Sequence, residues 1–130
     1  MQQKIFFKLY FWVIGVYDVL LGGVFALFYR NIFAYFKIIL PNHPAYIHVP
    51  ALFLMSAGIG EFLIARNLLR NVDLAIVRLL MKLSFASAVI YGYFRYGVPQ
   101  IFLIISIASV AGIVINILFL RWAILTNSAK

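Results

Sequence analysis

The chain has 130 residues, about the length of one domain, and carries a net charge of +8. Hydrophobic residues make up 66% and charged residues 11%, against about 45–50% and 25% in soluble globular proteins. One small core could not bury so much apolar surface, and disordered chains have the opposite composition, so both classes are excluded. The absence of cysteine excludes disulfides and thiolate metal sites.

Four apolar segments are long enough to cross a bilayer, which takes about 20 residues. They cover residues 9–28, 49–69, 74–94 and 101–122. We therefore expect a single domain over residues 1–130, an all-α membrane protein built as a bundle of four transmembrane helices. Asp73 can cap the start of the third span, and Gly97 and Pro99 suit a helix end followed by a helix start. The first span is too long for a signal peptide and contains Asp18, so we expect it to stay in the mature protein.

The connection between the first and second spans has about twenty residues and a helical pattern of its own. Apolar residues recur at helical spacing over residues 30–40, with two basic residues among them. This pattern predicts a short amphipathic helix lying on the outer membrane surface. We expect Pro41 to end that helix, and Pro44 and Pro50 to keep the returning segment extended.

The basic residues predict the orientation, because Lys and Arg concentrate in cytoplasmic loops. They sit at the ends of apolar segments, which argues against a nucleic acid partner for the positive charge. Seven lie on one side of the predicted membrane and three on the other, so we expect both termini in the cytoplasm. The two sets are Lys4, Lys8, Arg66, Arg70, Arg78, Arg121 and Lys130 against Arg30, Lys37 and Arg95.

Three ionisable residues fall well inside the predicted spans. Asp18, Glu61 and Lys82 each lie eight or nine residues from the cytoplasmic end of their span, which is about 12–14 Å deep. A charge at such depth costs at least about 2.5–3.5 kcal/mol, so such groups normally face the bundle and pair. We expect the three to converge in the bundle interior, with Lys82 close to at least one carboxylate. Arg78, one turn from Lys82, would supply a second positive charge.

The helix faces that carry these groups are lined with small residues, which let membrane helices approach closely. A short repeat, Gly15-x-x-Asp18 and Gly58-x-x-Glu61, stands out, although eight glycines can produce two such matches by chance. The complete set of candidate site residues is Asp18, Glu61, Arg78, Lys82, Ser109 and Asn116. One interpretation is an ionic network that holds the helix register. Another is a proton relay or the polar end of a ligand pocket, and a third is that one group snorkels to the interface.

The sequence contains no recognised catalytic set and no glycine-rich phosphate loop, so we expect no enzyme activity and no cofactor. His43 and His48 are weak candidates for a metal site, because no acidic residue lies near them to complete it. Both histidines lie outside the spans, which argues against haem held between helices. We expect them to be interfacial side chains.

The layout resembles a broad group of small bacterial four-span proteins, loosely the DoxX-like families. The resemblance covers most of the chain and rests on a glycine-bearing first span, an outer segment over residues 28–40 and two short motifs. The motifs are Gly58-Ile59-Gly60-Glu61-Phe62-Leu63-Ile64-Ala65-Arg66-Asn67 and Leu79-Leu80-Met81-Lys82-Leu83-Ser84-Phe85. The fourth span departs from the family pattern, because it carries Ser106, Ser109 and Asn116 in place of acidic residues or tryptophans. The resemblance implies a bacterial cytoplasmic membrane and supplies no catalytic residue.

Two functional hypotheses follow. The first is a non-enzymatic membrane protein, either an accessory subunit of a larger complex or a self-associating bundle with a buried ionic network. The second is a small transporter or ligand-binding membrane protein that uses Asp18, Glu61 and Lys82 as its polar or proton-relay site. The expected partners are the lipid bilayer and either a second copy of the chain or other membrane subunits.

Overall fold

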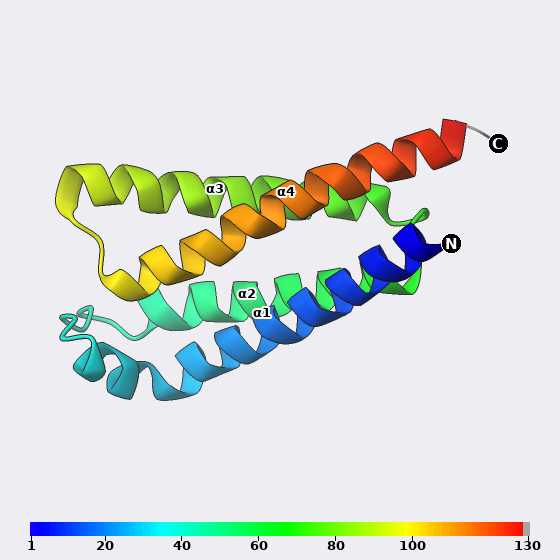
Figure 1. Cartoon of the computed structure of the whole chain (residues 1–130). Helices are drawn as coiled ribbons and strands as arrows, with labels where there is room; N and C mark the ends of the chain where they lie inside the picture. Colours follow the sequence, from blue (N-terminus) through cyan, green and yellow to red (C-terminus); the bar gives the residue numbers. More distant parts are fainter. Residues whose placement is uncertain (129–130) are drawn as a thin grey trace. The chain divides into compact units, whose positions relative to one another are not determined.

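A computed structural model of the chain describes residues 1–128, which form four α-helices joined by short connections (Figure 1). The helices are α1 (Gln2–Tyr35), α2 (Ala45–Arg66), α3 (Val72–Tyr96) and α4 (Gln100–Ser128). Each is long and apolar enough to cross a membrane, so the prediction of an all-α protein with four candidate spans is confirmed. Lys130, counted above for the orientation, lies outside the described residues.

The chain divides into two compact units, Met1–Leu68 and Leu69–Lys130. In the first unit, α1 and α2 run antiparallel along each other, and in the second unit α3 and α4 do the same (Figure 1). Each unit is thus a helical hairpin in which neighbours in sequence pack together. The assembly of both hairpins into one four-helix bundle stays a prediction.

Three of the four helices, α1, α3 and α4, extend at both ends beyond the apolar segments from which they were predicted. Helix α1 begins at Gln2 rather than near residue 9, and α4 continues to Ser128 rather than ending near residue 122. Hydrophobicity marks the stretch that suits lipid, whereas a helix continues through polar turns until a residue interrupts its hydrogen bonds. The predicted spans of α1, α3 and α4 are therefore the central parts of longer helices, whereas α2 begins four residues before its predicted span and ends three residues before the end of that span.

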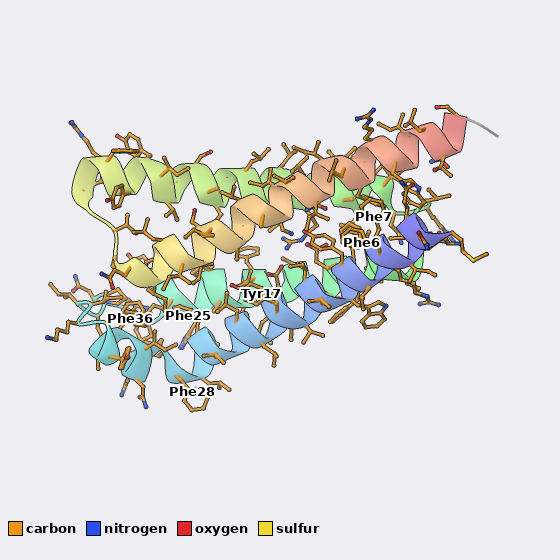
Figure 2. The ribbon with its side chains drawn as sticks, in the orientation of Figure 1. Phe6, Phe7, Tyr17, Phe25, Phe28 and Phe36 are labelled. Carbon is orange, nitrogen blue, oxygen red and sulfur yellow. The ribbon has the colours of Figure 1, made fainter. Side chains whose placement is uncertain are left out.

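The separate amphipathic helix predicted over residues 30–40 is not present. Residues 30–35 instead continue α1 beyond Phe28, whose backbone is not helical (φ −117°, ψ 17°). The helix bends here, and the side chain of Phe28 points away from the helix pair (Figures 1 and 2). No glycine or proline stands between Phe28 and Tyr35, so nothing stops the helix before that point.

Helix α1 ends in a Schellman motif rather than at Pro41. The N–H of Ile38 donates to the carbonyl of Phe33 at 2.8 Å, and the N–H of Lys37 donates to the carbonyl of Ala34 at 3.2 Å. Lys37 closes the motif with a positive φ of 53°, in the position that glycine usually occupies. Because a lysine stands there, the sequence carried no signal for this helix end.

The prediction that Pro44 and Pro50 keep the returning segment extended is also wrong, because Pro44 has helical backbone angles (φ −57°, ψ −27°). Helix α2 begins directly after Pro44, and Pro50 lies inside it. A proline at this position removes the hydrogen bond to the carbonyl of Tyr46. Tyr46 is exposed at the start of the helix, where water or lipid headgroups can reach its backbone. The helix therefore tolerates the proline near its end.

The remaining connections are short. Asn71, not Asp73, precedes α3, so the capping role predicted for Asp73 is wrong, although its carboxylate in the first turn favours the helix dipole. The end of α3 is as predicted. Gly97 follows the helix with a φ of 73°, and the N–H of Phe102 donates to the carbonyl of Pro99 at the start of α4.

Candidate functional site

Helices α1 and α2 meet through glycines, with their backbones in direct contact. A Cβ atom added to Gly58 would lie 2.7 Å from the carbonyl oxygen of Gly15. Two turns further along α1, a Cβ atom added to Gly22 would lie 2.5 Å from the carbonyl oxygen of Ala51. These distances leave no room for a side chain. The prediction that small residues bring these two helices together is confirmed.

The two carboxylates flank the glycine crossing in a symmetrical way. Asp18 follows Gly15 by three residues, and Glu61 follows Gly58 by three residues. An approximate two-fold axis normal to an antiparallel helix pair relates two such segments, so both acids leave on the same side of the pair. Both are buried, with exposed fractions of 5% and 0%. The Gly-x-x-acid repeat therefore forms a paired structural element.

The two carboxylates do not start from the same depth, contrary to the prediction. With Gly15 opposite Gly58, Asp18 lies level with Met55, which is six residues from Glu61 or about 9 Å along the helix. Side chains tilt toward the N-terminus of their own helix, which shifts these two toward each other. The prediction failed because it measured depth from apolar segment ends that are not level in the hairpin.

Helix α3 buries two cations on one face. Arg78 and Lys82 are four residues apart and have exposed fractions of 4% and 8%. The Nη1 atom of Arg78 donates a hydrogen bond to the Sδ atom of Met81 at 3.5 Å. Ala75 and Ala86 are buried at the two ends of the same face. Small neighbours leave space for these long side chains to lie along the helix.

Helix α4 contributes the third kind of buried polar group, the amide of Asn116. This side chain is fully buried, and among residues 1–128 neither its nitrogen nor its oxygen has a hydrogen-bond partner. Two turns earlier on α4, the Oγ atom of Ser109 donates a hydrogen bond to the carbonyl of Ile105 at 3.1 Å. Buried polar groups normally find partners, so Asn116 is an exception that needs a physical reason.

Sequence reasoning left Ser106 out of the candidate site, although it is buried on α4. Its spacing from Ser109 and Asn116, three and ten residues, places all three along one helix face. That spacing was the available signal.

The two histidines make local contacts. The Nδ1 atom of His43 accepts a hydrogen bond from the N–H of Ala45 at 3.1 Å. The ring of His48 packs edge-on against Tyr29, with ring centroids 5.3 Å apart. Within the described part of the chain, no three residues of the metal-ligating types gather into a group. These contacts account for both side chains as neighbours of helix ends.

The buried charges divide by unit. The first hairpin buries two carboxyl groups and the second buries two cations and an amide. A buried carboxyl group can hold or release a proton, and a buried cation can stabilise a negative charge. The convergence of Lys82 with Asp18 and Glu61 stays a prediction.

Comparison of the chain with protein-family models, with curated proteins and with solved structures finds no match.

Proposed function

We propose that the chain is a multi-pass membrane protein without catalytic activity, acting as an accessory subunit of a larger complex or as a self-associating bundle. One observation carries the proposal. Asp18, Glu61, Arg78 and Lys82 are all buried, while large apolar residues such as Leu20, Ile59 and Leu80 are exposed on the same helices α1, α2 and α3. This distribution suits lipid outside and polar contacts inside.

The buried charges then serve to select one arrangement of the helices. A carboxylate facing lipid is costly, so rotating or sliding a helix that carries one is costly too. The glycines of the α1/α2 crossing and the buried charges of α1, α2 and α3 would thereby hold the helices in register without any chemistry. Buried polar groups have this role in some other helical proteins.

A neutral substitution tests this function. Asp18→Asn removes one charge while keeping shape, and under the proposal it lowers expression and thermal stability in detergent. It should produce no change in proton or solute flux, because the proposed protein carries none. A variant that keeps wild-type thermal stability but abolishes a measurable flux in vesicles would contradict the proposal.

A second candidate, a small transporter or ligand-binding protein, is favoured by the amide of Asn116. A fully buried amide that has no hydrogen-bond partner among residues 1–128 is suited to a polar ligand or a water molecule. Vesicles loaded with a pH-sensitive dye separate the two candidates. Proton uptake that depends on both Asn116 and Asp18 would favour transport, and its absence would favour the accessory role.

The proposal includes a bacterial cytoplasmic membrane, with both termini in the cytoplasm. The excess of Lys and Arg on one side supports this orientation, and it makes the connection over residues 36–44 extracytoplasmic. Single cysteines at Asn71 and Asn42 test it in intact cells. An impermeant thiol reagent should label the cysteine at position 42 and not the one at position 71. The reverse labelling would overturn the orientation.

The choice between accessory subunit and self-association needs a separate experiment. Purification of the chain in a mild detergent, followed by measurement of the mass of the complex, distinguishes a multiple of the chain's own mass from a mixed complex. A monomer without companions would contradict both forms of the proposal.

A further inference from the structure

The face of the α1/α2 hairpin away from the two carboxylates carries an aromatic pair. The rings of Trp12 and Phe62 lie with centroids 4.8 Å apart and planes tilted by 35°. Phe62 also covers the glycine crossing, because a Cβ atom on Gly15 would lie 2.5 Å from its ring. Trp12 keeps 46% of its surface exposed. The aromatic pair therefore closes the crossing from the outside and still presents a surface.

Helix geometry places this pair on the opposite side from the acids. Trp12 precedes Gly15 by three residues, whereas Asp18 follows it by three, so the two side chains leave α1 on different sides of the crossing. Phe62 and Glu61 diverge in the same way on α2. Their burial agrees with this, because both acids are buried while Trp12 is not.

Two cations stand one helical turn beyond the aromatic pair. Lys8 precedes Trp12 by four residues and Arg66 follows Phe62 by four, so in the antiparallel hairpin both lie toward the same end. Both are exposed, and among residues 1–128 neither makes an ion pair. The acidic residues of this hairpin, Asp18 and Glu61, are buried on its other side. Within their own hairpin, the two cations thus have no counter-charge on the same face.

We propose that Lys8, Arg66, Trp12 and Phe62 form a binding site for one anionic phospholipid. Along the hairpin the order is positive charge, then aromatic rings, then exposed apolar residues such as Val16 and Ile59. A phospholipid has the matching order of phosphate, glycerol esters and acyl chains. Arginine binds phosphate oxygens through paired N–H groups, and tryptophan favours the headgroup layer. Basic groups beside membrane helices recognise anionic headgroups in this way.

Trp12 can report the bound lipid directly. The chain has two tryptophans, so Trp122→Phe leaves Trp12 as the single fluorophore. The Trp122→Phe variant is the parent of all the variants below. It is reconstituted into phosphatidylcholine vesicles that contain a minor fraction of a lipid brominated on its acyl chains. The brominated lipid is either phosphatidylglycerol or phosphatidylcholine, and bromine quenches a tryptophan that it contacts. We expect brominated phosphatidylglycerol to quench Trp12 with about tenfold higher apparent affinity.

Two double variants that remove the same charge distinguish a lipid-binding site at Lys8 and Arg66 from a general effect of surface charge. Lys8→Gln with Arg66→Gln should bring the two lipids to equal quenching, and either substitution alone should cost about threefold. Arg95→Gln with Arg121→Gln removes the same charge from exposed positions on α3 and α4 and should keep the preference. The single variants stand in if the double variant loses its thermal unfolding transition.

Three results would overturn the proposal. Equal quenching by both brominated lipids in the parent would mean that Trp12 contacts lipid without selection. Equal loss of preference in both double variants would assign the preference to net charge. Displacement by soluble glycerol phosphate would mean that the site takes a free phosphate rather than a lipid.

Discussion

The two hairpins hold their helices together in different ways. Helices α1 and α2 touch through backbone atoms at Gly15, Gly22 and Gly58, and they bury short acidic side chains beside that contact. The buried face of α3 carries alanines with two long cations, Arg78 and Lys82. Close backbone packing leaves room beside the crossing for short carboxylates, whereas an alanine-lined face can hold longer stems. The packing of each hairpin thus agrees with the sign of the charge that it buries.

The largest loss of stability should come from removing one buried cation of the second hairpin. Lys82→Met leaves two buried carboxyl groups against one cation and should lower the free energy of unfolding by about 3–5 kcal/mol. Lys4→Met, at an exposed position outside the proposed lipid site, is the control and should change it by less than about 0.5 kcal/mol. Both are measured by denaturant unfolding in detergent.

Double-mutant cycles that include Lys82→Met test whether Lys82 pairs with Asp18 or Glu61. Lys82→Met combined with Asp18→Asn or Glu61→Gln should cost less than the sum of the two single losses, because a lone buried charge is the expensive state. Strictly additive losses in both cycles would contradict the predicted convergence of these groups.

The next largest effect on stability should distinguish substitutions at two adjacent glycines, Gly22 and Gly23. Gly22→Ala places a methyl group 2.5 Å from the carbonyl oxygen of Ala51 and should cost about 1–3 kcal/mol, because backbone must move to admit it. A Cβ on Gly23 meets nothing within 4 Å, so Gly23→Ala should stabilise the helix by up to about 1 kcal/mol. Thermal unfolding of the two variants gives the comparison. Similar effects of both would mean that α1 and α2 do not pack as closely as the structure has them.

A smaller effect of opposite sign is expected in the second hairpin. Asn116→Leu replaces an amide that has no hydrogen-bond partner among the described residues with an apolar side chain of similar size, so it should raise stability by about 1–2 kcal/mol. Ser109→Ala is the control, because its hydroxyl is already bonded to Ile105, and should change little. A loss of stability in Asn116→Leu would show that a ligand, water or partner satisfies the amide in the membrane.

The smallest effect lies at the end of α1. Lys37→Gly removes the steric cost of a positive φ and should stabilise the protein by about 0.5–1 kcal/mol. Lys37→Ala removes the same charge but keeps the Cβ atom, so it should bring no gain. Equal stability of the two variants in a thermal melt would argue against the Schellman motif at this position.

The sequence could predict what hydrophobicity and helix periodicity determine. The four helices and the burial of Asp18, Glu61, Arg78 and Lys82 follow from the cost of polar groups in lipid. These features depend on residue type and spacing alone, which a single sequence displays.

The features it missed depend on backbone geometry. The end of α1 uses Lys37 where glycine is usual, and Pro50 is tolerated inside α2 because the carbonyl that it leaves unbonded, that of Tyr46, lies at the helix start. The offset of Asp18 from Glu61 depends on the hairpin register, which apolar segment ends do not define. The Trp12–Phe62 pair was missed because its two residues come from different helices, and their contact requires that same register.

The length of α1 makes the thickness of the bilayer a variable for this protein. Its 34 residues would extend about 51 Å if the helix were straight, against a hydrocarbon core of about 30 Å, whereas the 22 residues of α2 extend about 33 Å. The two helices are locked at their glycines, so α1 cannot tilt alone, and the excess must leave the core at its ends or at the bend near Phe28. A thicker membrane would favour a straighter α1 and a thinner one a stronger bend, so acyl-chain length would act on the segment from Phe28 to Tyr35 more than on any part of α2.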